Sequence, residues 1–103
     1  MLGNFSKEDF EWDKKKNKIL KATRKISFEE ILDFLENKEN ILAVFKHPNK
    51  NKYPNQKVFI LNINGYAWVV PFEERGDKIR LITAFPSRKW TKMFLRGKRN
   101  EGR

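Results

Sequence analysis

Most of the side chains in this chain that could carry chemistry are cationic. Its 103 residues include 23 Lys and Arg but a single histidine, His47, and no cysteine. Zinc sites are built from several Cys, His or carboxylate ligands, so this composition argues against one. The glycine-rich phosphate loops of nucleotide-binding folds are also absent from the sequence. We therefore expect no metal and no cofactor, and we interpret His47, which precedes a proline, as an ordinary polar loop residue.

Several of the cations occupy positions where they could hold a phosphate. Arg80 lies in the middle of an apolar run, and its planar guanidinium can bond two phosphate oxygens, although a mid-strand arginine often pairs with a carboxylate instead. Arg88 and Lys89 follow that run closely, and Lys57 begins the apolar stretch. The simpler interpretation is a solvated basic face, and the residues alone leave both interpretations open.

A set of cations of this kind is compatible with RNA cleavage. The 2′-hydroxyl attacks the adjacent phosphorus, so an enzyme must align it, neutralise the pentavalent phosphorane and move protons. Arginine and lysine can neutralise the charge, and a lysine, tyrosine or glutamate with a shifted pKa can move the proton. Tyr53, in a polar stretch over residues 46–56, is a candidate for that role. Trp68 or Trp90 could stack a base, although core packing is the commoner role of tryptophan.

The charge balance points to a polyanionic partner. The formal net charge is +10 at pH 7, which favours nucleic acid first and an acidic protein or an anionic membrane second. The acidic residues fall into a few clusters, and none occurs in residues 14–28, 40–72 or 78–100. Long stretches of the chain therefore carry only positive charge.

Residues 57–85 are predicted to form the platform that positions these side chains. Three apolar runs, over 58–63, 66–72 and 79–85, are joined by Asn64-Gly65 and by a polar turn over 74–77. Strands linked this closely can pair only antiparallel, so the stretch predicts a three-stranded meander. In the last run, alternation places Lys78, Arg80, Ile82 and Ala84 on one face.

Caps and periodicity predict the elements on both sides of the meander. Phe10 and Trp12 flank a charged residue, as in a short edge strand, and Asp13 can cap a helix. Ser27 and Glu30 form a capping box. The predicted elements are, in chain order, the edge strand at 10–12, helices over 14–25 and 28–36, a strand over 41–45, and a final helix over 88–95.

The first predicted helix has two distinct sides. One side is a stripe of lysines, and the other is a short apolar stripe. Lys16 lies on the apolar side, where its ammonium is expected to extend outward along the surface. The lysine stripe comprises residues 14, 18, 21 and 25, and the apolar stripe comprises Ile19, Leu20 and Ala22.

The length predicts a single domain over residues 1–103. Residues 1–8 and 96–103 are expected to be flexible, the latter because they are basic and contain glycine. No run approaches the roughly 18 apolar residues of a membrane span, and the first residues do not read as a secretory signal. We therefore expect a soluble, cytoplasmic protein that does not bind a membrane.

From Phe10 to Leu95 the chain resembles the BrnT-like toxins, a branch of the RelE-type ribonuclease toxins of bacterial toxin–antitoxin pairs. Several motifs agree in order and spacing, and they cover most of the chain. The segments that carry the resemblance are Phe10-Glu11-Trp12-Asp13 with Lys16, Ile26-Ser27-Phe28-Glu29-Glu30, residues 53–57, Glu74-Arg75-Gly76-Asp77-Lys78-Ile79-Arg80-Leu81-Ile82, and residues 85–89.

The resemblance implies a RelE-like α+β fold, with a small antiparallel sheet, two N-terminal helices and one C-terminal helix, all packed on one side. It implies an endoribonuclease that cleaves mRNA and inhibits translation. It also implies a cognate antitoxin, of the ribbon-helix-helix DNA-binding kind, through which alone the toxin would reach operator DNA. Lys16, Lys57 and Arg80 are carried over by position, whereas Arg88 and Lys89 are added for their charge and placement.

The sequence departs from the family pattern at three places. The usual Lys-His-Gly after the first helix is Thr23-Arg24-Lys25, a histidine of some members is Phe72, and the Arg-Arg pair after the last strand is Phe85-Pro86. These departures leave the proton carrier open. Two alternatives to a nuclease therefore remain: a non-catalytic nucleic-acid-binding module that uses the same basic face, and a protein whose surface chiefly binds an acidic antitoxin.

Overall fold

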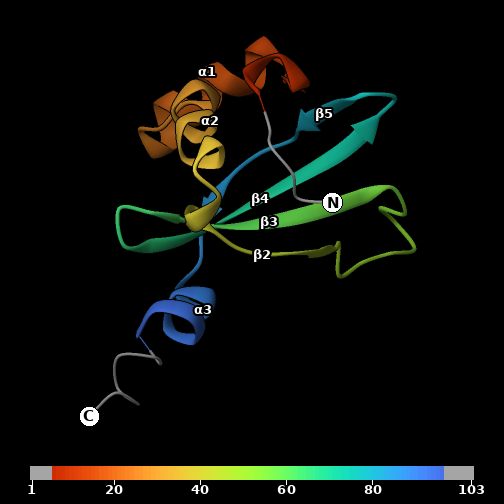
Figure 1. The fold of residues 1–103 in the computed structure, drawn as a ribbon. Coiled ribbons are helices and arrows are strands. Elements are labelled where there is room, and N and C mark those ends of the chain that lie inside the picture. The colour runs from red at the N-terminus through yellow and green to blue at the C-terminus, as the bar shows by residue number, and fades with distance from the viewer. Residues whose placement is uncertain (1–5, 97–103) are drawn as a thin grey trace.

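Two long neighbouring strands, β3 (Gln56–Ile63) and β4 (Tyr66–Arg75), form the centre of the fold. The computed structural model describes residues 6–96 and is α+β, with one sheet and helices on both of its faces (Figure 1). The sheet has the order β1-β5-β4-β3-β2, and β6 also pairs with β4. The remaining elements are η1 (Lys7–Asp9), β1 (Phe10–Glu11), α1 (Lys14–Arg24), α2 (Phe28–Glu36), η2 (Lys38–Asn40), β2 (Ile41–Lys46), β5 (Lys78–Leu81), β6 (Phe85–Pro86), α3 (Arg88–Thr91) and the π-helical η3 (Lys92–Arg96).

The predicted antiparallel meander is confirmed. β3 pairs with β4, and β4 pairs with β5, both antiparallel. Asn64 and Gly65 connect the first pair with φ angles of 54° and 87°, the left-handed conformation that a two-residue hairpin turn of this kind requires. Gly76 has a φ of 60° in the second turn. Both turns therefore form where the sequence predicted them.

The last strand of the meander is shorter than its apolar run predicted. We expected one strand over 79–85, but β5 ends at Leu81 and β6 begins at Phe85. β5 pairs with the end of β4, whereas β6 pairs with an earlier part of it. The predicted alternation fails in the segment between them, because Leu81 and Ala84 enter the same core although they are three positions apart.

The predicted edge strand near the N-terminus also forms, but its pairing is parallel. β1 lies beside β5, with Phe10 opposite Ile79 and Glu11 opposite Arg80. The sheet is therefore mixed rather than purely antiparallel. A parallel pair needs a long connection, which here includes α1, α2 and the first three long strands.

Parts of both terminal segments predicted to be flexible, residues 1–5 and 97–103, lie outside the described residues. Residues 7–9 form η1, which contacts distant parts of the fold. Lys7 forms an ion pair of 3.3 Å with Asp33 of α2, and the Lys78 ammonium donates a hydrogen bond to the carbonyl of Glu8. The described start of the chain is thus joined to α2 and to β5.

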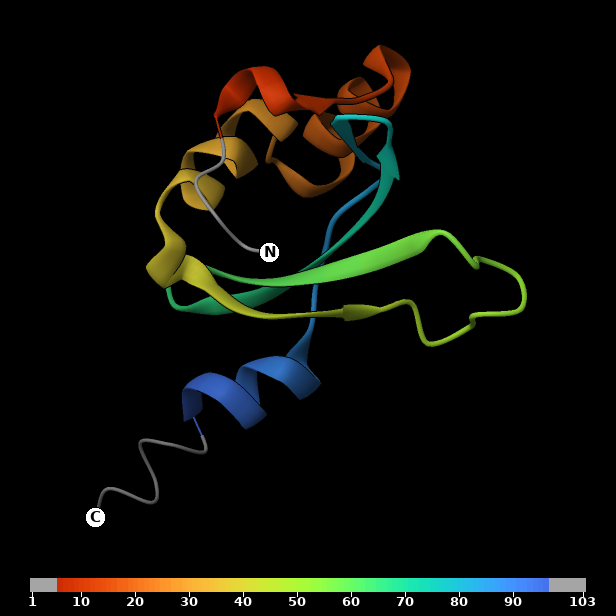
Figure 2. The ribbon, with the colours of Figure 1, turned by 45° about the vertical axis from the view of Figure 1, so that its right-hand side comes forward.

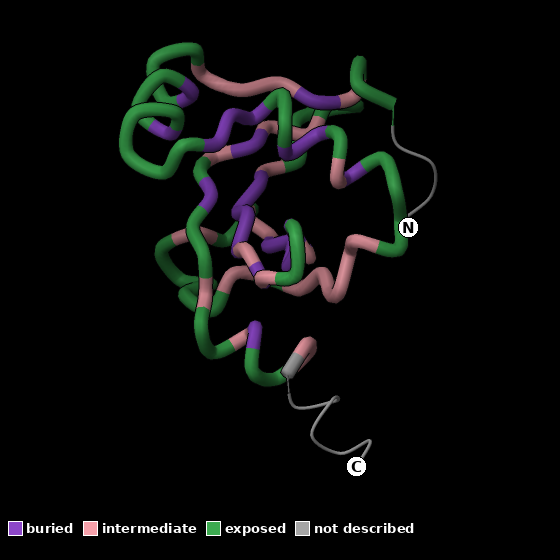
Figure 3. Tube along the Cα trace, turned by 90° about the vertical axis from the view of Figure 1, so that its left-hand side faces the viewer, coloured by how far each residue is buried: buried purple, intermediate pink, exposed green. Residues whose placement is uncertain are grey.

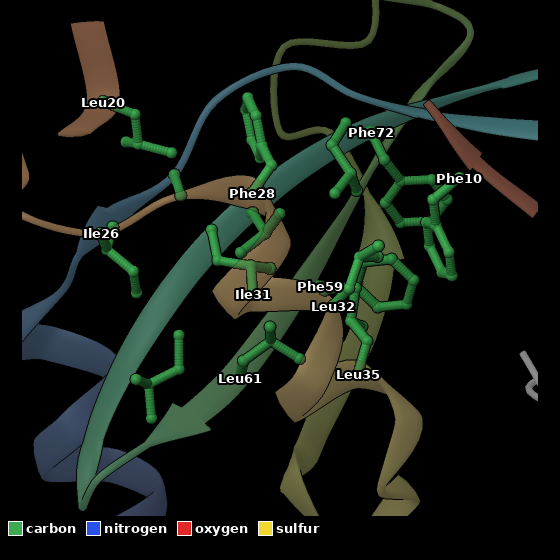
Figure 4. Close-up of a cluster of buried hydrophobic side chains, with 14 residues drawn as sticks. Phe10, Leu20, Ile26, Phe28, Ile31, Leu32, Leu35, Phe59, Leu61 and Phe72 are labelled. Carbon is green, nitrogen blue, oxygen red and sulfur yellow. The ribbon is translucent and has the colours of Figure 1, made fainter. Parts of the chain in front are cut away.

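The two faces of the sheet are buried in separate hydrophobic cores. Along β3, Phe59 and Leu61 pack against α1 and α2, whereas Val58 and Ile60 pack against α3 and η3. Figures 1 and 2 show α1 and α2 on one side of the sheet and α3 on the other, and Figure 4 shows the larger core. The expectation that all helices lie on one side is therefore wrong. We call the two sides the α1/α2 face and the α3 face.

A polar contact, rather than an apolar stripe, joins α1 to α2. Of the predicted stripe only Leu20 is buried, and Ile19 is 60% exposed. Asn17 is buried instead: its side-chain oxygen accepts a hydrogen bond from the Phe28 N–H at 2.8 Å, and its side-chain nitrogen donates to Glu29 at 2.9 Å. The Asn17 amide thus bonds the Phe28 N–H and the Glu29 carboxylate in the first turn of α2 and fixes α1 beside that helix. The outer side of α1 stays exposed (Figure 3).

The helix caps form as predicted. The Asp13 carboxylate accepts a hydrogen bond from the Lys15 N–H at 2.7 Å, and Ser27 and Glu30 form the capping box. α1 ends at Arg24, and its C-cap Lys25 adopts the left-handed conformation with a φ of 60°. Within residues 6–96, no helix has the length and apolar character needed to cross a membrane.

Replacing Asn17 with alanine is expected to lower the free energy of unfolding by about 1–3 kcal/mol, because the buried Phe28 N–H loses its acceptor. Urea or thermal unfolding followed by circular dichroism would measure the change. The matched control is Lys18→Ala at the next, exposed position, which should change stability by less than about 0.5 kcal/mol. Equal stability of the two variants would contradict this role of Asn17.

The same contact predicts a pH dependence of stability. The side-chain hydrogen bond from Asn17, followed by the hydrogen bond from the backbone of Glu29, lowers the pKa of Glu29 below its usual 4.5. Because the folded-state pKa is the lower one, the stabilisation is present above the unfolded-state pKa and is lost as pH falls through the folded-state pKa. Asn17→Ala should therefore show a shallower loss of unfolding free energy than the wild type below about pH 5. If the unfolding free energies of Asn17→Ala and of the wild type fell equally steeply as pH decreased, the prediction would be contradicted.

Candidate nucleic-acid interface

α3 covers only part of the α3 face because hydrogen bonds attach it to the first half of β4. Thr91 is 2% exposed. Its hydroxyl accepts a hydrogen bond from the Ala67 N–H at 2.9 Å and donates one to the Ser87 carbonyl at 2.7 Å. The Ser87 N–H in turn donates to the Ala67 carbonyl at 2.9 Å. The opposite ends of the long strands extend past this short helix (Figure 2).

A row of polar residues crosses the face beyond α3. Gln56 lies opposite Glu73, Glu73 lies opposite Arg80, and Arg80 lies opposite Glu11. Directly opposed residues project from the same face of a sheet. Phe72, which precedes Glu73 in β4 and therefore points to the other face, projects into the α1/α2 core. The row therefore lies on the α3 face, at the end of the sheet where β2 and β3 are joined by their loop.

A pocket of about 280 Å³ opens on the α3 face beside α3. We call it the α3-face pocket. Its walls are mostly apolar, and the polar residues that line it are His47, Ser87 and Lys89. Its apolar walls are formed by Phe45, Val58, Val69, Pro71, Phe85 and Trp90, together with Pro48.

His47 is oriented by its own loop. Its backbone N–H donates to the Gln56 carbonyl at 3.0 Å, which extends the pairing of β2 and β3 by one position. Its Nδ1 accepts a hydrogen bond from the Asn49 N–H at 3.0 Å, so the neutral ring carries its proton on Nε2. The Tyr53 ring lies 4.6 Å from the imidazole, centroid to centroid. The loop thus fixes both the ring plane and the tautomer.

Lys89 lies on the side of the pocket formed by α3. Its ammonium is 4.9 Å from the centroid of the Trp90 ring, and that ring packs on Phe45 with a centroid distance of 5.4 Å. Trp90 is half-buried and contributes to the smaller core, as core packing predicted. Arg88, the preceding residue, is exposed at the start of α3. Of these two predicted cations, Lys89 therefore lines the pocket and Arg88 precedes it in α3.

Arg80 occupies the opposite border of the same face. Its guanidinium is 3.4 Å from the Glu11 carboxylate, so the pairing with an acid that the sequence left open is observed. The cross-strand partner of Arg80 is Glu73. Pro71, which lines the pocket, lies two residues before Glu73 in β4, so Pro71 and Arg80 project from the same face. Strands lie about 4.8 Å apart, so three steps across the sheet separate Arg80 from His47 by roughly 14 Å.

Lys16 lies near Arg80 but at the outer edge of the fold. It lines a separate pocket of about 340 Å³ between α1 and residues 82–83. Both cations lie close enough to Asp13 to act on it: the hydrogen bond from the Lys15 N–H is the main cause that lowers the pKa of this carboxyl, and the charges of Arg80 and Lys16 lower it further.

The expectation that Arg80, Arg88 and Lys57 meet at one anion pocket is wrong. Lys57 lies opposite Phe72, so it projects from the α1/α2 face, whereas Arg80 projects from the other. The Lys57 ammonium is 3.2 Å from the Glu74 carboxylate. The alternation of β3 and β4 separates the two cations although their strands are near neighbours.

His47 is the residue that the sequence interpretation undervalued. It lies in the loop, as predicted, but two positions after Phe45, so its side chain continues the α3 face of β2 and lines the α3-face pocket. The same alternation, extended past the predicted strand end, was the available signal. Tyr53, predicted as a proton carrier, lies beside this imidazole.

In the described part of the chain, no group of three or more His, Asp or Glu side chains could hold a metal ion. Among known proteins, a family model described as the ribonuclease toxin BrnT of type II toxin–antitoxin systems matches residues 12–93. This range is most of the chain and includes His47, Arg80 and Lys89. No curated protein and no solved structure matches the chain.

Proposed function

The chain belongs to the BrnT family of ribonuclease toxins of type II toxin–antitoxin systems, and from that premise we propose that it is an endoribonuclease that cleaves mRNA and thereby inhibits translation. Its site of action would be the cytoplasm, where mRNA is translated. The observation that carries the proposal is the α3-face pocket, because a histidine and a lysine line one apolar cavity, with Arg80 farther across the same face of the sheet.

In the proposed mechanism, the scissile phosphate lies across the rim of the pocket. His47 donates a hydrogen bond from Nε2–H to a phosphorane oxygen, because Nδ1 already accepts a hydrogen bond from the Asn49 N–H. Lys89, with Arg88 before it in α3, neutralises the charge that develops on the phosphorane oxygens. Arg80, at the opposite border of the face, would hold a neighbouring phosphate of the same strand. The 2′-oxygen–phosphorus bond forms as the bond to the 5′-oxygen breaks. Of Tyr53 and a lysine, one takes the proton of the 2′-hydroxyl and the other supplies a proton to the leaving 5′-oxygen.

This arrangement gives a role to five of the six residues predicted from the sequence. Arg80, Arg88 and Lys89 bind phosphate, and Tyr53 supports His47 through the ring contact. Lys16, beside Asp13, would contact RNA farther along the strand. Lys57 projects from the opposite face and has no part in the mechanism. All of these steps use protein groups alone, so we propose that cleavage needs no metal ion.

As a type II toxin, the protein has a cognate antitoxin. We propose that this partner is a ribbon-helix-helix DNA-binding protein and that the toxin reaches operator DNA only through it.

The contact of Arg80 with Glu11 favours one alternative function, a non-catalytic RNA-binding module, because a carboxylate already offsets part of the arginine charge.

Replacing His47 with alanine is expected to slow RNA cleavage about 10²- to 10³-fold, because the phosphorane loses the hydrogen bond from Nε2–H. Lys89→Ala and Arg80→Ala should each slow it about 10-fold or more through lost charge stabilisation. The measurement is the cleavage rate of a labelled RNA by purified protein in the presence of EDTA. The matched control is Lys38→Ala, an exposed lysine of η2 that should retain the wild-type rate.

The outcomes of this experiment separate the alternatives. Cleavage that disappears in EDTA would exclude the metal-independent mechanism. Full activity of His47→Ala would exclude the role assigned to its Nε2–H. A wild-type protein that binds RNA without cleaving it would be the non-catalytic module instead.

A further inference from the structure

We propose that the α3-face pocket binds one unpaired nucleobase of the RNA beside the scissile phosphate, and that Phe85 is the side chain on which this base stacks. The inference rests on the proposed function and deepens it, since it assigns base preference to a specific part of the site. The base pocket and the phosphate site would share the His47 and Lys89 rim.

The distribution of polarity in the pocket fits a nucleotide. The walls come from apolar and aromatic side chains, while the ionisable groups, His47 and Lys89, lie among the lining residues contributed by the loop and by α3. The Ser87 hydroxyl already accepts a hydrogen bond from the Trp90 N–H at 3.2 Å, as the cap of α3. A ligand for this cavity therefore needs a flat, weakly polar body attached to an anion, as in a base with its phosphate.

Phe85 is the aromatic ring best placed to stack a base. It is 37% exposed, although β6 holds its backbone opposite Val69 of β4. Trp90 and Phe45, the other aromatic rings of the pocket, pack on each other and belong to the smaller core. Among the described residues, the other exposed large hydrophobic side chains are Ile19 and Met93, and neither lines this pocket.

The irregular backbone before β6 explains this exposure. The chain leaves strand geometry after Leu81 and resumes pairing at Phe85, which places Ala84 in the large core and Phe85 on the α3 face. A regular strand over the same residues would place residue 85 on the same side as residue 81, in the α1/α2 core. The break thus turns an aromatic ring out of the larger core and into the wall of the pocket.

The charges around the pocket favour RNA over an apolar side chain of a protein. The net charge is +10, and residues 78–100, which include β6 and α3, contain no acidic residue. Single-stranded RNA presents unpaired bases to aromatic side chains, whereas a duplex presents mainly its backbone. The pocket should therefore distinguish single strands from duplexes, and charge alone should not.

The test compares binding of one sequence as a single strand and as a duplex, both made of 2′-O-methyl RNA, which has no 2′-hydroxyl to attack. Phe85→Ala should weaken single-strand binding about 5- to 150-fold and leave duplex binding unchanged. Phe85→Trp should retain single-strand binding because it keeps a ring. Met93→Ala, an exposed hydrophobic residue outside the pocket, is the matched control and should resemble the wild type.

A second measurement uses unmodified RNA of mixed sequence. Phe85→Ala should lose base preference at one nucleotide next to the cut, and Met93→Ala should keep it. If Phe85→Ala does not fold, Phe85→Leu, which keeps apolar volume without a ring, replaces it with the same expectation.

The results separate this inference from the proposed function. Wild-type protein that fails to cleave unmodified RNA overturns the nuclease, whereas the binding series still decides the pocket. An equal effect of Phe85→Ala on single strand and duplex, or no effect on either, overturns the base pocket. Loss of antitoxin binding in Phe85→Ala with unchanged RNA binding would show that the pocket holds an antitoxin side chain instead.

Discussion

The burial of both faces of β3 and β4 is the constraint on which the rest of this structure depends. Phe59 and Leu61 enter one core, and Val58 and Ile60 enter the other. A shift of register by one residue would exchange the two sets and expose both cores to the wrong helices. Because neither face can be left to solvent along these residues, α1 and α2 must cover one side and α3 the other. The middle of the sheet is therefore covered by helices on both faces, whereas its ends are left open.

The candidate site lies at the end that α3 leaves uncovered. The paired hydrogen bonds of Thr91 and Ser87 with Ala67 fix the helix over the first half of β4, so Pro71 and Glu73 lie beyond it. A longer or differently placed helix would fill the α3-face pocket. The cavity is thus a consequence of where a short helix is anchored, and the residues that border it come from four separate parts of the chain.

Charge is distributed unequally between the sheet and its surroundings. On the strands, cations lie beside acids: Arg80 beside Glu11, and Lys57 beside Glu74. α3 and the loop between β2 and β3 belong to stretches of sequence without any acid. Positive potential is therefore expected to be greatest on the side where His47 and Lys89 line the pocket, and there the attraction of an RNA backbone is offset least by nearby acids.

The sequence alone determined the features that depend on neighbouring residues: the caps at Asp13 and Ser27, the turn at Asn64-Gly65, the antiparallel meander of β3, β4 and β5, and the family resemblance. It could not determine which cations share a face, because that depends on register and on the irregular segment between β5 and β6. Tertiary structure alone separated Lys57 from Arg80, buried Asn17 in place of Ile19, and brought His47 to Lys89. The physical reason is that a side chain's direction reverses with every residue of a strand, so a single break in the alternation redirects everything that follows it.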